Sequence, residues 1–121
     1  MAYQGEAMEQ QKLIEWCDWK RIPIFAIPNG GKRNAKEAHF MKLSGVKAGV
    51  PDLFLPIASN GCHGLFIEMK YGKNKPTENQ EEWIALLMQN GYQVAVCYSA
   101  DAAIDIIRRY LNNDKTGNPR Q

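Results

Sequence analysis

The sequence predicts a single mixed α/β domain in which helices flank a central β-sheet. The chain has 121 residues, of which 45% are hydrophobic and 23% charged, as expected for one globular domain with one core. Segments with helical spacing of apolar residues alternate with short apolar segments, in the order α-β-α-β-β-α-β-α. Strands separated by helices favour a mixed sheet covered by helices. We expect a core over about residues 6–111 and a polar tail over 112–121.

The first half of the chain contains two predicted helices, one short strand and a glycine-rich loop. Apolar residues at helical spacing indicate the first helix, and Pro23 stands at the start of the strand. Gly45 is a typical helix-ending residue. The expected elements are a helix over 6–20, a strand over 22–27, a turn over 28–31, a helix over 33–44 and a loop over 46–50.

The second half contains a predicted hairpin followed by a helix, a strand and a last helix. Thr77 and Gln80 have the spacing of a capping box, and Gly91 suits the position that follows a helix. Asn60-Gly61 favours a tight turn between two antiparallel strands. The expected elements are strands over 52–57 and 65–70, a helix that starts at Thr77, a strand over 92–98 and a helix over 100–111.

Two acidic residues and a lysine occupy related places on the two strands of this hairpin. Glu68 and Lys70 are two residues apart on one strand, so their side chains share one face. Asp52 begins the preceding strand, and a hairpin brings the start of one strand opposite the end of the next. We therefore expect Asp52 to lie close to Glu68 or Lys70.

Two carboxylates with open coordination positions form a hard oxygen site suited to Mg²⁺ or Mn²⁺. The backbone carbonyl of Met69 is a candidate third ligand, and Lys70 is placed to orient a water or to stabilise a phosphate in transfer. This pattern predicts metal-dependent phosphodiester cleavage. A structural interpretation is also open, in which Asp52 is a turn residue and Glu68 and Lys70 form a solvent-facing pair on an edge strand.

Positive charge is concentrated in one part of the chain, although the net charge is only +2. Between residues 20 and 47 the only acidic residue is Glu37. This segment is either a phosphate-facing patch or a solvated loop and helix face. Its seven basic residues are Lys20, Arg21, Lys32, Arg33, Lys36, Lys42 and Lys47.

Several other function classes are disfavoured. The three cysteines are far apart and include no C-x-x-C pair, so neither a zinc site nor a disulfide framework is expected. No apolar run approaches the ~20 residues of a membrane span. Gly30-Gly31 does not belong to a Walker loop, and so no nucleotide cofactor is expected. The polar N-terminal residues lack a signal-peptide pattern, and we expect an intracellular protein.

Four segments in order closely resemble the VRR-NUC family, a branch of the PD-(D/E)XK nuclease superfamily found as stand-alone phage and bacterial enzymes. The resemblance runs from about Glu6 to Leu111 and implies a restriction-endonuclease-like core and a metal-dependent DNA endonuclease. The segments are Ile27-Pro28-Asn29-Gly30-Gly31-Lys32-Arg33, Gly45-Val46-Lys47-Ala48-Gly49-Val50-Pro51-Asp52-Leu53, Phe66-Ile67-Glu68-Met69-Lys70 and Thr77-x-x-Gln80-x-x-Trp83.

The resemblance also implies roles for single residues. Asp52 and Glu68 would be metal ligands and Lys70 the catalytic lysine. Gln80 would lie near the site, and its alternative role is that of capping-box partner of Thr77. The segment Glu6-Ala7-Met8-Glu9-Gln10 fits the Glu-x-x-x-Gln of the family's first helix, so Glu6 is a candidate further ligand. Glu9 is its rival, and either could be a first-turn acid favoured by the helix dipole. Ala26 departs from the basic residue that many members carry before the Asn-Gly turn.

The resemblance and the small size imply a homodimer with two symmetric sites, which suits a four-way DNA junction as the substrate. The expected location is the cytoplasm of a bacterial or phage-infected cell. Alternatives are a catalytically silent nucleic-acid-binding module of the same fold, and a nuclease with flap or RNA substrates. The residues expected to contact DNA are Asn29, Lys32, Arg33, Lys36, Lys47 and Lys73.

Overall fold

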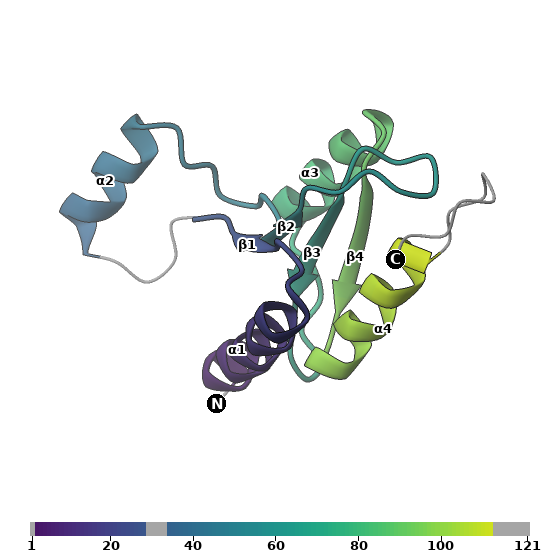
Figure 1. Cartoon of the computed structure of the whole chain (residues 1–121). Coiled ribbons are helices and arrows are strands. Elements are labelled where there is room, and N and C mark those ends of the chain that lie inside the picture. Colours follow the sequence, from purple (N-terminus) through teal and green to yellow (C-terminus); the bar gives the residue numbers. More distant parts are fainter. Residues whose placement is uncertain (1, 29–33, 113–121) are drawn as a thin grey trace.

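The computed structural model describes residues 2–28 and 34–112, except for the side chains of 2–4. In this part of the chain four helices and four strands follow the predicted order (Figure 1). They are α1 (Ala2–Lys20), β1 (Phe25–Ala26), α2 (Ala35–Leu43), β2 (Leu53–Leu55), β3 (Leu65–Met69), α3 (Glu78–Gln89), β4 (Gln93–Cys97) and α4 (Ala100–Asn112).

The four strands form one mixed sheet in the order β1-β2-β3-β4. β1 pairs with β2, and β2 with β3, in antiparallel orientation, whereas β3 and β4 are parallel. The predicted hairpin is therefore confirmed. Leu53 pairs with Ile67, and this register places Asp52 opposite Glu68.

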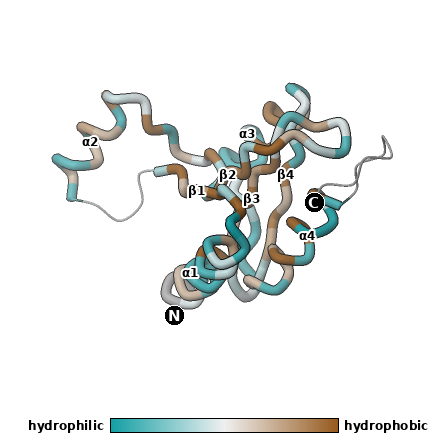
Figure 2. The backbone as a smooth tube through the Cα atoms, viewed as in Figure 1, coloured by the Kyte–Doolittle hydropathy of each residue, from teal (hydrophilic) through white to brown (hydrophobic). Residues whose placement is uncertain are grey.

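The core lies between one face of the sheet and the two helices α1 and α4 (Figure 1). Alternate strand residues point to this face, and brown and teal bands alternate along α4 where apolar residues turn inward (Figure 2). The other face of the sheet is covered by α3. The fully buried core side chains include Leu13, Leu53, Leu55, Leu65, Ile67, Met69 and Ile107.

Aromatic side chains stiffen the hairpin on the face that points away from this core. The rings of Phe54 and Phe66 stack with their centroids 4.3 Å apart, and Phe25 meets Phe54 edge-on at 5.7 Å. Gly64 lies against the Phe54 ring, where an added Cβ would come within 2.7 Å of it. Such aromatic pairs contribute about 1 kcal/mol each beyond their area burial. The hairpin that carries the two carboxylates is therefore held rigid by aromatic packing.

Several predicted boundaries differ from the observed ones. The first helix begins at Ala2 rather than at residue 6. The strand predicted over 22–27 has only two residues, because β1 is an edge strand that pairs with β2 alone. The strand predicted over 52–57 ends at Leu55, before Pro56, which has no backbone N–H to donate. Part of the turn predicted over 28–31 lies outside the described residues.

The predicted start of α3 is confirmed by its cap. The Thr77 hydroxyl accepts a hydrogen bond from the Gln80 N–H, and Gln80 Oε1 accepts one from the Thr77 N–H. Gly91 follows the helix at φ +92° and lies against His63, where a Cβ would come within 2.6 Å of the ring.

Within residues 2–28 and 34–112, no helix is both long and apolar enough to cross a membrane.

Candidate active site

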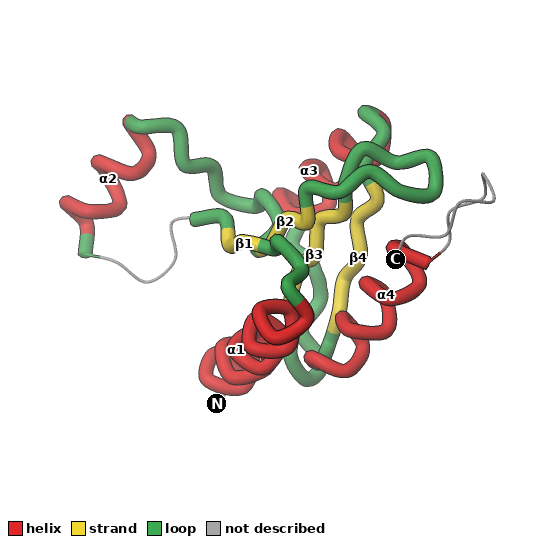
Figure 3. Tube along the Cα trace, in the orientation of Figure 1, coloured by secondary structure: helices red, strands yellow, loops and turns green. Residues whose placement is uncertain are grey.

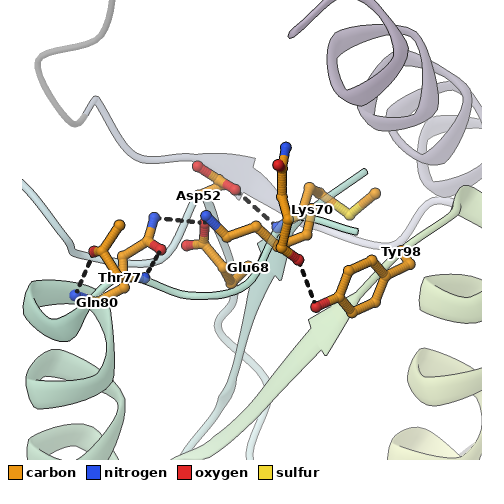
Figure 4. Close-up of polar contacts among 8 residues, drawn as sticks. Asp52, Glu68, Lys70, Thr77, Gln80 and Tyr98 are labelled. Carbon is orange, nitrogen blue, oxygen red and sulfur yellow. Dashed lines mark hydrogen bonds and ion pairs between the residues drawn. The ribbon is translucent and has the colours of Figure 1, made fainter. Parts of the chain in front are cut away.

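The sheet brings Asp52, Glu68 and Lys70 together at one end of the hairpin (Figure 4). Asp52 directly precedes β2, while Glu68 is the fourth residue of β3. The backbone N–H of Met69 donates a hydrogen bond to Asp52 Oδ2 at 2.8 Å. This contact holds the Asp52 carboxylate against the strand that carries Glu68.

Glu68 is a buried acid, with only 2% of its surface exposed. Its Oε2 accepts a hydrogen bond from Gln80 Nε2 at 3.0 Å and lies 3.7 Å from Lys70 Nζ. Its Oε1 is also buried, but it has no hydrogen-bond partner among the residues that the structure describes. A buried carboxylate oxygen without a partner is costly. This oxygen is therefore available to a ligand.

The electrostatics of Glu68 point to the same conclusion. Burial raises the pKa of the Glu68 carboxyl to about 8, and the negative charge of Asp52 adds to this rise, while the Lys70 ammonium opposes it. Two carboxylates that repel one another in a buried place are stabilised by a divalent cation between them. The Glu68 oxygen without a hydrogen-bond partner and the nearby Asp52 carboxylate are the kind of donors that a divalent cation uses.

The donor set is small. Across the described ranges, no group of three or more His, Cys, Asp or Glu side chains is arranged to hold a metal ion. A metal would therefore depend on the two carboxylates together with backbone oxygens and water. Mg²⁺ is commonly bound in this way, through one or two carboxylates with several waters retained.

Lys70 is buried beside Glu68, in the arrangement that the alternation of strand residues predicts. Its backbone N–H donates to the Cys97 carbonyl at 2.9 Å, which extends the pairing of β3 with β4 past the strand end. Its ammonium lies 3.7 Å from Glu68 Oε2, and only 9% of the residue is exposed.

Gln80 performs both of the roles that its position suggests. Its Oε1 accepts from the Thr77 N–H and completes the cap of α3, while its Nε2 donates to Glu68 Oε2. The two ends of one amide therefore connect a helix start to the buried acid (Figure 4).

The structure places Glu6 and Glu9 in different environments. Burial raises the pKa of Glu6, the negative charge of Asp52 raises it further, and the Lys70 ammonium opposes the rise. Glu6 therefore lies within electrostatic reach of the site. Glu9 Oε1 instead accepts from the Ala100 N–H at 2.8 Å, and this hydrogen bond at the start of α4 lowers its pKa. Its other oxygen, Oε2, is paired with Lys12.

The contact between Gly5 and Tyr71 was not foreseen from the sequence. Tyr71 follows Lys70, and its ring lies against the first turns of α1, where a Cβ on Gly5 would be 2.5 Å from it. This close approach docks the helix segment that carries Glu6. A glycine inside a helix is the only hint that the sequence offers.

Asn79 is a second unforeseen contributor. Its Nδ2 donates to the Ala48 carbonyl at 2.9 Å, and Gly49 at φ +94° lies against it, where a Cβ would approach to 3.0 Å. Asn79 thereby ties the loop that leads into Asp52 to the first turn of α3. Asn79 is an exposed residue shortly after the helix cap, and no sequence pattern there predicts its hydrogen bond to Ala48.

The residues predicted to contact DNA are only partly described. Lys36 on α2, Lys47 in the loop after it and Lys73 after β3 are all exposed. Asn29, Lys32 and Arg33 lie outside the described residues.

Two comparisons with known proteins agree on one family. A family model for the VRR-NUC domain matches residues 5–101. A solved structure described as a VRR_NUC domain protein shares 31% sequence identity and superposes with a TM-score of 0.78, covering 91% of this chain and 90% of that chain. No curated protein matches significantly. The matched range includes Glu6, Asp52, Glu68, Lys70 and Gln80.

Proposed function

Because this chain belongs to the VRR-NUC domain family, we propose that it is a Mg²⁺- or Mn²⁺-dependent endonuclease that hydrolyses phosphodiester bonds in DNA. The family supplies the nuclease-type fold. The observation that carries the proposal is the buried Glu68, whose Oε1 lacks a hydrogen-bond partner in the described part of the chain while Asp52 repels it. A divalent cation bound between the two carboxylates would give this oxygen a partner and would offset the repulsion from Asp52.

The ligands of the metal would be Asp52, Glu68 and the Met69 carbonyl. In an extended strand the N–H and C=O of one residue point the same way, and the Met69 N–H points to Asp52. A bound Mg²⁺ or Mn²⁺ would supply positive charge that neutralises the phosphate and lowers the pKa of a water molecule. Glu6 is the further acid that we assign to the site, since the charges of Asp52 and Lys70 both affect its pKa.

The remaining residues hold the carboxylates in place and stabilise the charge that develops during cleavage. The Lys70 ammonium, 3.7 Å from Glu68 Oε2, can donate to the attacking water or to the negative charge that develops on the phosphate. Gln80 orients Glu68 through its Nε2 hydrogen bond. The hydrogen bond from the Met69 N–H keeps Asp52 ionised and fixed, because a donated hydrogen bond favours the charged carboxylate.

The substrate that we propose is a four-way DNA junction cleaved by a homodimer. A single 13.7 kDa chain is too small to hold two duplexes, and a two-fold dimer would present two sites with matching symmetry. Lys36, Lys47 and Lys73 would contact phosphates, which gives affinity without reading sequence.

The test is a cleavage assay on four-way junctions, flaps, linear duplex and RNA. We expect junction cleavage in Mg²⁺, its abolition by EDTA, and a loss of about 10²-fold or more in Lys70→Ala, by analogy with the removal of one stabilising group from a hydrolytic site. Arg109→Ala removes an exposed positive charge on α4 and should cleave like the unmodified protein.

Other outcomes separate the alternatives. DNA binding without cleavage under every metal condition would identify a catalytically silent module. Equal cleavage of junction and duplex would refute the junction preference, and cleavage restricted to flaps or RNA would replace the substrate.

A further inference from the structure

A helix stands out from the body of the domain on one side of the active site. We call residues 34–51, which comprise α2 and the loop that joins it to β2, the arm. Figure 1 shows α2 well away from the sheet, Figure 3 shows the loop that joins α2 to β2, and no residue of α2 is buried. A helix in this position contributes little to the core, so its sequence is free to serve another purpose.

The C-terminal end of the arm lies at the active site, because residue 51 is directly followed by Asp52. The Ile27 N–H donates to the backbone carbonyl of Asp52 at 2.7 Å. This bond joins the residue that follows β1 to the residue that precedes β2. The bond from Asn79 to the Ala48 carbonyl braces the C-terminal end of the arm. Whatever the arm binds is therefore held in a defined relation to the Asp52 carboxylate.

One side of α2 exposes large apolar side chains. Phe40 is 60% exposed and Leu43 is 69% exposed, and their spacing of three residues puts them on one side of the helix. Ala38 and Met41 are half-buried and lie on another side. Apolar and polar segments alternate along α2 in Figure 2.

Basic residues flank this apolar pair in the sequence. Lys36, Lys42 and Lys47 are exposed, and the one acid of the helix, Glu37, accepts a hydrogen bond from Asn34 Nδ2 at 2.6 Å within the helix cap. The arm thus combines positive charge with an aromatic and an aliphatic side chain at its surface.

This combination favours DNA over a second copy of the chain. Two copies of the arm would each carry three exposed lysines and one acid, so their like net charge would oppose a contact between them. DNA offers phosphates to the lysines, and it offers apolar base faces to Phe40 wherever stacking is interrupted. In a continuous duplex these faces are hidden, whereas a branch whose arms are not stacked on one another exposes them.

We propose that the arm recognises the branch point of DNA, with Phe40 and Leu43 against unstacked bases and Lys36, Lys42 and Lys47 on the flanking phosphates. This inference rests on the proposed nuclease function and deepens it. Because the C-terminal end of the arm is joined directly to Asp52, the arm would fix the distance between the branch point and the phosphodiester bond that is cut.

The experiment places 2-aminopurine, a base whose fluorescence rises on unstacking, at the branch point of a four-way junction. Lys70→Ala is the parent, so that binding is measured without cleavage. We expect fluorescence to rise on binding. Adding Phe40→Ala and Leu43→Ala should abolish the rise and weaken junction binding by about tenfold, the size expected for losing one base–aromatic stack. Binding to linear duplex should change less than about twofold.

The matched control adds Leu86→Ala and Met88→Ala to the same parent. These side chains of α3 are also apolar and exposed, at 47% and 58%, and their loss should leave the signal unchanged. Circular dichroism checks that each variant is folded, which we expect because α2 has no buried residue. In the active protein, Phe40→Ala should also scatter the cut positions around the branch.

Three results would overturn the proposal. One is an unchanged fluorescence rise in the α2 variant. Another is an equal loss of binding to junction and duplex. The third is conversion of a dimer to a monomer that still unstacks the branch base, which would make α2 a contact between copies. A protein that unstacks the branch base but cuts no DNA would refute the nuclease function and leave this inference standing.

Discussion

At the scale of single residues, Glu68 is central to the proposed chemistry of the site. It is buried, it lies beside the Asp52 carboxylate, and its Oε2 is contacted by Gln80 and Lys70. The pKa of its carboxyl rises from 4.5 to about 8 because burial disfavours the charged form. This raised pKa favours the protonated carboxyl when no cation is bound, whereas a bound cation would favour the ionised form.

This pKa predicts how stability depends on pH. Between pH 4.5 and about 8 the unfolded chain has released this proton while the folded chain retains it, so the free energy of unfolding falls as pH rises through this window. Thermal unfolding in EDTA should show the native protein losing stability relative to Glu68→Gln over that range. Added Mg²⁺ should stabilise the native protein more at the upper end of the window than at the lower. Parallel pH profiles for the two proteins would contradict the assignment.

At the scale of elements, the site is assembled from the ends of five segments. The hairpin carries Asp52 and Glu68, α3 contributes Gln80, α1 brings Glu6, and β4 holds Lys70 through the Cys97 carbonyl. The capping box of α3 is both a helix start and a support for Glu68. Where the ends of several helices and strands meet, they can together bury charged groups that a single helix or strand would leave exposed.

The docking of α1 gives a prediction at this scale. In an isolated helix Gly5→Ala would stabilise by up to about 1 kcal/mol, but here the new methyl would collide with the Tyr71 ring. Because Tyr71 is 40% exposed, its ring is the part that can move, so we expect Gly5→Ala to loosen the packing of the turn that carries Glu6 and to lower kcat modestly while the core stays folded. Tyr71→Phe keeps the ring and should be neutral.

A double variant completes this test. Tyr71→Ala removes the obstacle, so Gly5→Ala should cost no further activity in that background. If Gly5→Ala is as active as the native protein, or if its effect persists after Tyr71→Ala, the contact does not position Glu6.

At the scale of the whole molecule, the sheet divides the domain into two parts. One face builds the core with α1 and α4, and the other carries the carboxylates beside α3, while the arm extends outward. The proposed homodimer predicts a solution mass of about twice 13.7 kDa. Sedimentation equilibrium measures this mass, and junction cleavage by a species of 13.7 kDa would refute the dimer.

Much of this organisation followed from local pattern. Alternation along a strand put Glu68 and Lys70 on one face, and hairpin geometry placed Asp52 opposite Glu68, as the Leu53–Ile67 register confirms. The spacing of Thr77 and Gln80 marked the start of α3. These features depend on residues close in sequence, whose relative positions are set by the periods of strands and helices.

Local patterns in the sequence were therefore enough to predict the order of elements, the fold class and the convergence of Asp52 with Glu68 and Lys70. Only the tertiary structure separated Glu6 from Glu9, because that choice depends on which turn of α1 faces the sheet and which meets α4. It also decided the Gly5–Tyr71 contact, the Asn79 brace and the exposure of Phe40. Each of these depends on how whole elements pack against one another, and periodicity within one element carries no information about the neighbour it will meet.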